Sequence, residues 1–120
     1  MDWCDEYVAA WNTNEVEALL AMFAPACRYT DVPHRMTWEG HDGIRKLFNL
    51  DMEFHPDKRM VRRGGFHDDQ HYALEWMISG TVSGQQVTYP GCSIGSLDGE
   101  GRIVEHRDYW NPKDIPSLGE

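Results

Sequence analysis

The chain has 120 residues, which is enough for one domain and too few for two. Hydrophobic residues make up 41% and charged residues 26%, as in an ordinary globular protein that holds its core without disulfides. A net charge of −9 argues against nucleic acid or an anionic membrane as a partner, because both bind clustered Lys and Arg.

The first part of the chain has the pattern of two helices. Four apolar side chains recur at helical spacing over residues 3–11, which predicts an amphipathic helix. Residues 12–14 interrupt this pattern, and Asn14 is a suitable cap for a second helix over residues 15–24. Pro25 is expected to end that helix, since proline cannot donate a backbone hydrogen bond.

A short strand and a third helix are predicted next. Residues 27–32 alternate in character as a strand does, and a loop is expected from Pro33 to Gly40. Residues 41–52 have the spacing of a helix whose buried stripe includes Ile44 and Phe48.

The second half of the chain has the pattern of strands. Glycine-containing turns separate four segments, at about residues 59–65, 71–79, 86–97 and 102–110. Helices that precede a run of strands indicate an α+β fold with a curved, mostly antiparallel sheet. Three helices covering one face of such a sheet leave a cone-shaped cavity between the two layers. We expect residues 1–120 to form this single domain.

The last of these strands carries the most suggestive side chains. Alternation places Val104, His106, Asp108 and Trp110 on one face of it, and Ile103, Glu105, Arg107 and Tyr109 on the other. Neither face is purely apolar, so the pattern does not decide which one points inward. A carboxylate buried beside apolar groups has a raised pKa and can exchange protons near neutral pH. The alternative is that Asp108 accepts hydrogen bonds and only stabilises the end of the strand.

Three stretches of sequence resemble one family of proteins. They are ALLAMFAPACRYTDVP, WEGHDGIRKLF and GRIVEHRDYWNP, which together span nearly the whole chain. Each is similar to a segment of the SnoaL-like polyketide cyclases and limonene-epoxide hydrolases, which share the nuclear transport factor 2-like fold. The resemblance is specific for the fold and says little about the reaction, because many chemistries use this cone.

The resemblance implies which side chains enter the pocket. Asp108 faces it, with His106 and Trp110 on the same side, and Tyr29 and Asp31 enter from the first strand. The epoxide hydrolases have an amide where this chain has Asp31, and the carboxylate favours acid–base chemistry. They also carry an Arg-x-Asp sequence on a middle strand, where this chain has Glu75-Trp76-Met77 and therefore no bridging arginine.

Some further residues are assigned to the pocket or excluded from it. Glu75 either faces the pocket or pairs with a cation on a neighbouring strand, and both readings stay open. His34 is predicted to line the mouth of the pocket, and Trp38 and Trp110 to contact an apolar ligand. His41, His55, His67 and His71 are expected at the surface, and no histidine spacing has the form of a metal site.

The cysteines and the absence of an apolar span bear on location. Three widely spaced cysteines without a CxxC motif or a signal peptide indicate reduced thiols and a cytoplasmic protein. No apolar run approaches the ~18 residues of a membrane span.

The main hypothesis is a cofactor-independent enzyme that acts on a small hydrophobic molecule by Asp/His acid–base catalysis. Asp108, His106, Asp31 and Tyr29 are its expected catalytic residues, and the reaction is a polyketide-type cyclisation, an isomerisation or a dehydration. Epoxide hydrolysis is one alternative. A non-catalytic ligand-binding or dimerisation domain is another, and in that case Ile103, Glu105 and Tyr109 would form a homodimer surface.

Overall fold

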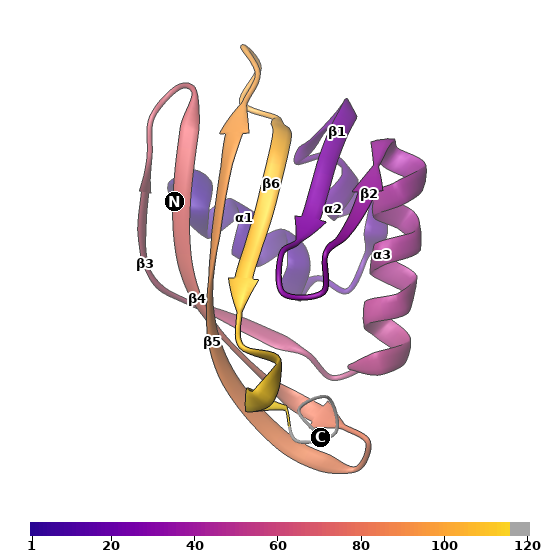
Figure 1. Cartoon of the computed structure of the whole chain (residues 1–120). Coiled ribbons are helices and arrows are strands. Elements are labelled where there is room, and N and C mark those ends of the chain that lie inside the picture. The colour runs from indigo at the N-terminus through magenta and orange to yellow at the C-terminus, as the bar shows by residue number, and fades with distance from the viewer. Residues whose placement is uncertain (116–120) are drawn as a thin grey trace.

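The computed structural model describes residues 1–115 (Figure 1). They form three α-helices, one short 3-10 helix and a six-stranded sheet. The helices are α1 (Trp3–Asn12), α2 (Val16–Leu20), α3 (Gly40–Phe54) and the 3-10 helix η1 (Pro112–Asp114). The strands are β1 (Phe23–Asp31), β2 (Met36–Glu39), β3 (Arg59–His67), β4 (His71–Val82), β5 (Gln85–Leu97) and β6 (Ile103–Trp110).

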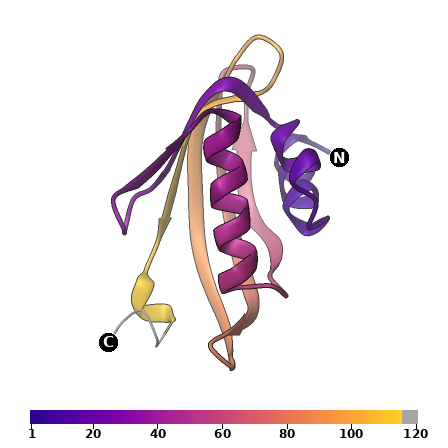
Figure 2. The same ribbon diagram turned by 90° about the vertical axis from the view of Figure 1, so that its right-hand side faces the viewer.

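The sheet is curved and mostly antiparallel. Its strand order is β2-β1-β6-β5-β4-β3, and every neighbouring pair is antiparallel except β1 and β6, which run parallel. β4 and β5 are the longest strands, and they extend in a curve beyond the rest of the sheet (Figure 1). Figure 2 shows the helices on one side of this sheet. The predicted α+β class is confirmed.

The first helix forms where the sequence pattern predicts it. The Asp2 carboxylate caps it by accepting a hydrogen bond from the backbone N–H of Asp5 at 3.0 Å. Its buried face carries Trp3, Tyr7 and Trp11, which point toward the sheet, and the helix packs mainly against β3. This contact closes one side of the space between the helices and the sheet.

The third helix closes the other side. It buries Ile44 and Phe48 and packs against β1 and β2, while Lys46 faces solvent. Helix α3 begins one residue before and ends two residues after the predicted segment 41–52. Leu47 and Asp51 lie on the side of this helix that faces the cavity described below.

The segment around the first strand differs from the prediction in two ways. Helix α2 ends at Leu20 instead of residue 24, because β1 already begins at Phe23 and pairs there with Ile103. Pro25 therefore lies inside a strand, within the stretch where the β1–β6 register shifts. The predicted loop after Asp31 is also wrong in part, since residues 36–39 form β2 and pair antiparallel with β1.

A bulge in the last strand changes which side chains face inward. Ser96 pairs with Glu105 and Leu97 pairs with Ile103, so Val104 is the extra residue between them. Ile103 is consequently 0% exposed and belongs to the core, while Val104 is 38% exposed. Alternation had grouped Val104 with His106, and Ile103 with Glu105 and Tyr109, and this grouping is wrong for both residues. Ile103 therefore cannot contribute to the homodimer surface of the non-catalytic alternative. Beyond the bulge, the alternation holds.

Other expectations about individual residues can be compared with the structure. His55 was expected in solvent, but it is fully buried and stacks on Tyr89, because residue 55 ends α3 beneath β4 and β5. His67 and His71 are exposed as expected. All three cysteines are unpaired. No helix within residues 1–115 has the length and apolar character that a membrane crossing requires.

Candidate active site

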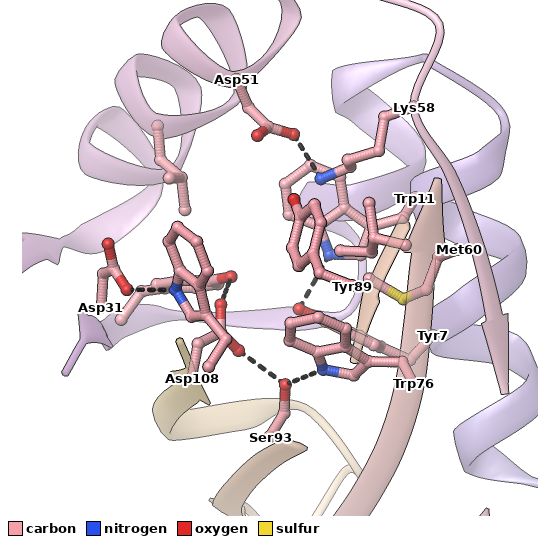
Figure 3. Close-up of a pocket in the computed structure, with 14 residues that line it drawn as sticks. Tyr7, Trp11, Asp31, Asp51, Lys58, Met60, Trp76, Tyr89, Ser93 and Asp108 are labelled. Atoms are coloured by element: carbon pink, nitrogen blue, oxygen red, sulfur yellow. Dashed lines mark hydrogen bonds and ion pairs between the residues drawn. The ribbon is translucent and has the colours of Figure 1, made fainter. Parts of the chain in front are cut away.

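A two-part cavity lies between the helices and the concave face of the sheet. Figure 3 shows the residues that line its inner chamber. The inner chamber has a volume of about 100 Å³, and an outer chamber of about 300 Å³ adjoins it. The two chambers share five lining residues, namely Asp31, Leu47, Asp51, Tyr89 and Trp110. A ligand that enters through the outer chamber can therefore place one end in the inner one.

The pairing of the strands determines which side chains meet in the inner chamber. Ser93 on β5 pairs with Asp108 on β6, and Asp108 pairs with Asp31 on β1. Side chains directly opposite one another on neighbouring strands lie about 5 Å apart on the same face of a sheet. One row across three strands thus brings a hydroxyl and two carboxylates to the concave face.

Asp108 is the most heavily hydrogen-bonded of these groups. Its Oδ1 accepts a hydrogen bond from Ser93 Oγ at 2.6 Å and contacts His106 Nε2 at 2.7 Å. Its Oδ2 accepts a hydrogen bond from the hydroxyl of Tyr29. The side chain is still 15% exposed and lines the chamber, so a ligand can reach the carboxylate.

These contacts reverse the pKa shift that the sequence led us to expect. Burial, the largest single effect, raises the pKa of Asp108. The charge of His106 and the hydrogen bonds from His106, Ser93 and Tyr29 lower it, and together they prevail. The pKa of Asp108 is therefore below its ordinary value, which makes it a carboxylate at neutral pH. The expectation of a raised pKa is wrong because it considered burial without these donors.

Behind Asp108, His106 is fully enclosed. Its Nε2 faces Asp108, and its Nδ1 forms a hydrogen bond with the hydroxyl of Tyr72, which reaches it across β5. Gly95 makes this crossing possible, because a methyl group there would overlap the Tyr72 hydroxyl. Burial raises the pKa of Tyr72 well above its usual value, so it remains a neutral phenol. His106 thus supports Asp108 and does not line either chamber.

A second pair of a histidine and a carboxylate lies at the boundary between the chambers. Asp31 Oδ1 accepts a hydrogen bond from Trp110 Nε1 at 2.7 Å, and Asp31 Oδ2 lies 2.7 Å from His34 Nδ1. The Nε2 atom of His34 has no hydrogen-bond partner within residues 1–115. His34 lines the outer chamber, as predicted for the mouth.

A third polar pair lies away from Asp108, on the helix side of the cavity (Figure 3). The ammonium of Lys58 binds the carboxylate of Asp51, and its Nζ lies 3.8 Å from the centroid of the Trp11 ring. Lys58 is only 7% exposed, and both charged residues line the inner chamber. Two residues after Lys58, the backbone of Met60 in β3 forms two hydrogen bonds with the side chain of Asn12 at the end of α1, at 2.8 and 2.9 Å. These bonds hold the start of β3 against α1.

The remaining walls are apolar and largely aromatic. Trp76 lines the inner chamber and donates its indole N–H to Ser93 Oγ at 2.8 Å. Trp38 lines the outer chamber, where the sequence predicted contact with an apolar ligand. Glu75, by contrast, is exposed on the convex face of the sheet, because it alternates with the inward-facing Leu74 and Trp76. Its reading as a pocket residue is wrong.

The sequence analysis missed four polar residues of this site. Ser93 and Tyr72 lie on strands that were predicted correctly, but their inward position could be read only from the strand register. Lys58 and Asp51 come from a loop and a helix, and no motif in the sequence distinguished either of them from a charged residue that faces solvent. Among residues 1–115, no three His, Cys, Asp or Glu side chains are grouped to hold a metal.

Three helices on one face of a curved six-stranded sheet are the nuclear transport factor 2-like fold, also called ketosteroid isomerase-like. Within this fold class, the family model for the SnoaL-like domain matches residues 4–106. The protein belongs to this SnoaL-like family, as the sequence resemblance indicated. A comparison with curated proteins finds no match.

Several solved structures share the fold. A hypothetical protein from Catenulispora acidiphila DSM 44928, with a ketosteroid isomerase-like fold and bound trimethylamine, has a TM-score of 0.85 at 19% identity; the match covers 95% of this chain and 88% of that one. The epoxide hydrolase/cyclase-like enzyme SalBIII, which has a role in pyran ring formation in the polyether salinomycin, has a TM-score of 0.79 at 20% identity. The match covers 92% of this chain and 88% of SalBIII. A putative SnoaL-like polyketide cyclase from Jannaschia sp. CCS1 has a TM-score of 0.79 at 13% identity. The match covers 94% of this chain and 85% of the Jannaschia protein.

Proposed function

We propose that the protein is a cofactor-independent enzyme that moves a proton on a small hydrophobic molecule, with Asp108 as the general base. The observation that carries this proposal is an ionised carboxylate that reaches a cavity while three protein groups hold it in place. A base positioned in this way contributes on the order of 10²–10⁴-fold to a proton-transfer step. Isomerases, cyclases and dehydratases of small molecules can all begin with such a step.

The surrounding residues have distinct roles in this proposal. Tyr29 and Ser93 fix the orientation of the carboxylate, and His106 shares its charge through Nε2. Oδ2 accepts only the Tyr29 hydroxyl among the described residues, so one of its lone pairs is available to a proton on the ligand. Asp31 and His34 stand where the ligand enters and can orient it or a water molecule.

The alternative of epoxide hydrolysis has less support. No arginine contributes to the lining of either chamber within residues 1–115, so the arginine that bridges two carboxylates in the epoxide hydrolases has no counterpart there. The Jannaschia protein is named a putative polyketide cyclase, whereas the name of SalBIII includes both epoxide hydrolase and cyclase, so these names alone do not separate the two activities. Incubation with a cyclic epoxide and analysis for the diol tests the alternative directly.

The main proposal is tested by hydrogen exchange at carbon. The protein is incubated in deuterium oxide with tetralones, indanones and cyclic diketones, and proton NMR follows the loss of signals next to the carbonyl group. We expect faster exchange for at least one of these ketones, and Asp108→Asn should lower that rate on the order of 10²–10⁴-fold. The matched control is Asp42→Asn, which changes an exposed carboxylate in the first turn of α3.

Two outcomes would contradict the proposal. An exchange rate that survives Asp108→Asn rules out Asp108 as the base. Saturable binding of the ketones without any exchange would instead identify a ligand-binding domain, which is the non-catalytic alternative. Circular dichroism of both variants distinguishes a lost base from a lost fold.

We also propose that two copies of the chain associate through the convex face of the sheet. This face carries exposed apolar side chains from three strands, namely Val61, Ile94, Val104 and Tyr109. Exposed apolar side chains that gather on one face of a protein often mark an interface. Light scattering after size-exclusion chromatography should give the mass of a dimer, and Tyr109→Glu should lower it to that of one chain.

The three unpaired cysteines agree with a reducing compartment such as the cytoplasm.

A further inference from the structure

The ion pair of Lys58 and Asp51 lies inside the cavity and has no part in holding Asp108. Lys58 leads into β3, and Asp51 lies on α3, whereas Asp108 and Ser93 come from β6 and β5 (Figure 3). The inner chamber therefore has an anionic group on the sheet and a cation on the helix side. Taking an ammonium out of water is unfavourable unless partners compensate for the loss.

The partners that the protein supplies leave this ammonium incompletely bonded. An ammonium has three N–H donors. One binds Asp51, the Trp11 ring contacts the cation, and within residues 1–115 no other hydrogen-bond acceptor meets Nζ. Lys58 also lines the inner chamber. A donor of this kind can bind an oxygen atom of the ligand.

We infer that Lys58 binds the carbonyl oxygen of an enolisable substrate and stabilises the negative charge that develops on it, with Asp51 as the residue that positions the ammonium. This inference rests on the proposed function, and it narrows the substrate class to small, flat ketones or enones. The aromatic walls formed by Trp11, Trp76 and Tyr89 suit such a molecule.

The proton and charge balance of the step is complete without another reactant. Asp108 takes a proton from the carbon next to the carbonyl group, and the C–H electron pair becomes the new carbon–carbon double bond. The π pair of the carbonyl group moves onto its oxygen, beside Lys58. Protonated Asp108 then returns the proton to the same carbon or to a conjugated one. One negative charge thus moves from Asp108 toward the ammonium, which is where fixed charge stabilises a transition state best.

The test uses para-nitrophenol, a flat phenol whose ionised form mimics an enolate and absorbs visible light. The protein is titrated into the phenol at a pH below that at which it ionises in water. We expect the wild-type protein to bind it as the phenolate, seen as a rise in visible absorbance. Lys58→Met should weaken this binding roughly 10- to 100-fold, as expected for the loss of a charge-assisted hydrogen bond. Lys46→Met, at an exposed position of α3, is the matched control and should change nothing.

Two further variants keep the inference falsifiable. Asp51→Asn keeps an oxygen atom that can orient the ammonium and removes the negative charge that competes with the phenolate for it, so this variant should bind the phenolate more tightly, even if Lys58→Met fails to fold. Asp108→Asn should lower proton exchange on ketones on the order of 10²–10⁴-fold but retain phenolate binding, which separates a failure of this inference from a failure of the proposed base. Equal phenolate binding by the wild type and Lys58→Met, or no phenolate bound by either, would overturn the inference.

Discussion

The hydrogen bond between Tyr72 and His106 offers a sharp test of how the site is supported. The Tyr72 side chain is 2% exposed, and its hydroxyl group bonds the Nδ1 atom of His106, which is itself fully buried. Tyr72→Phe removes a single oxygen atom and keeps the ring that packs against Trp3. The variant therefore leaves one buried ring nitrogen without its partner and disturbs little else.

The expected magnitude follows from this geometry. Leaving a buried polar atom unpaired costs about 1–3 kcal/mol, because its hydrogen bond to water is not restored. No cavity larger than the missing oxygen forms, so a further packing loss is not expected. For a domain of this size, each kcal/mol lowers the melting temperature by about 4 °C. We therefore expect Tyr72→Phe to lower the melting temperature by roughly 4–12 °C.

Urea denaturation followed by tryptophan fluorescence measures this loss. The midpoint should fall while the slope of the unfolding free energy against urea stays constant, since the surface exposed on unfolding is unchanged. The matched control is Tyr109→Phe, which changes an exposed tyrosine whose hydroxyl group has Arg107, at 3.3 Å, as its one hydrogen-bond partner among the described residues. The control should stay within about 0.5 kcal/mol of the wild type. Equal stability of the two variants would refute the reasoning.

Three other predictions concern single groups of the same structure. Gly95→Ala should destabilise the fold and displace the Tyr72 ring, seen in near-ultraviolet circular dichroism, because its methyl group would overlap the Tyr72 hydroxyl and the Glu105 carbonyl oxygen. Ser93→Ala should raise the pKa of Asp108, measured by carbon NMR of the carboxyl group, because one of the donors that lower it is lost. Burial lowers the pKa of His55 below 6.5, so the free energy of unfolding should fall as the pH drops below about 6.5.

Each of these predictions has its own counter-result and control. A Gly95→Ala protein with wild-type stability would mean that β5 can shift without cost, and Gly99→Ala is the control because a methyl group there meets no other atom within 4 Å. An unchanged Asp108 titration in Ser93→Ala would show that His106 and Tyr29 suffice. His55 binds a proton more readily in the unfolded chain than in the folded one, and this makes the free energy of unfolding depend on pH. Between about pH 5 and 7, that dependence should be weaker in His55→Leu than in the wild type.

Much of the fold could be predicted from spacing alone, and the misplaced elements have a common physical cause. Helix and strand periodicities are local signals, and they located α1, α3 and the four later strands. Pairing between distant strands is not a local signal. It ends α2 early and draws residues 36–39 into a sheet, because a tertiary hydrogen-bond ladder overrides local preference there.

The candidate site was predictable only where the family resemblance fixed the inward face. Asp108, Tyr29 and Asp31 do meet at the concave face, as that resemblance implied. The bulge at Val104 could not be anticipated, since alternation gives no hint of an extra residue in one strand. Lys58 carried no usable sign either, because a lysine between a helix and a strand normally faces solvent.

The direction of the Asp108 pKa shift decides what kind of chemistry this cavity can begin. A carboxyl group surrounded only by apolar walls would hold its proton at neutral pH and act first as an acid. Here Ser93, His106 and Tyr29 bond the carboxylate and keep it ionised before a ligand arrives, so in the proposed reaction Asp108 acts first as a base. A reaction that starts by removing a proton leaves an electron pair to be accommodated on the ligand. Among residues 1–115, Lys58 is the one lysine that lines the inner chamber, so in the proposed reaction its ammonium receives the charge that proton removal by Asp108 creates.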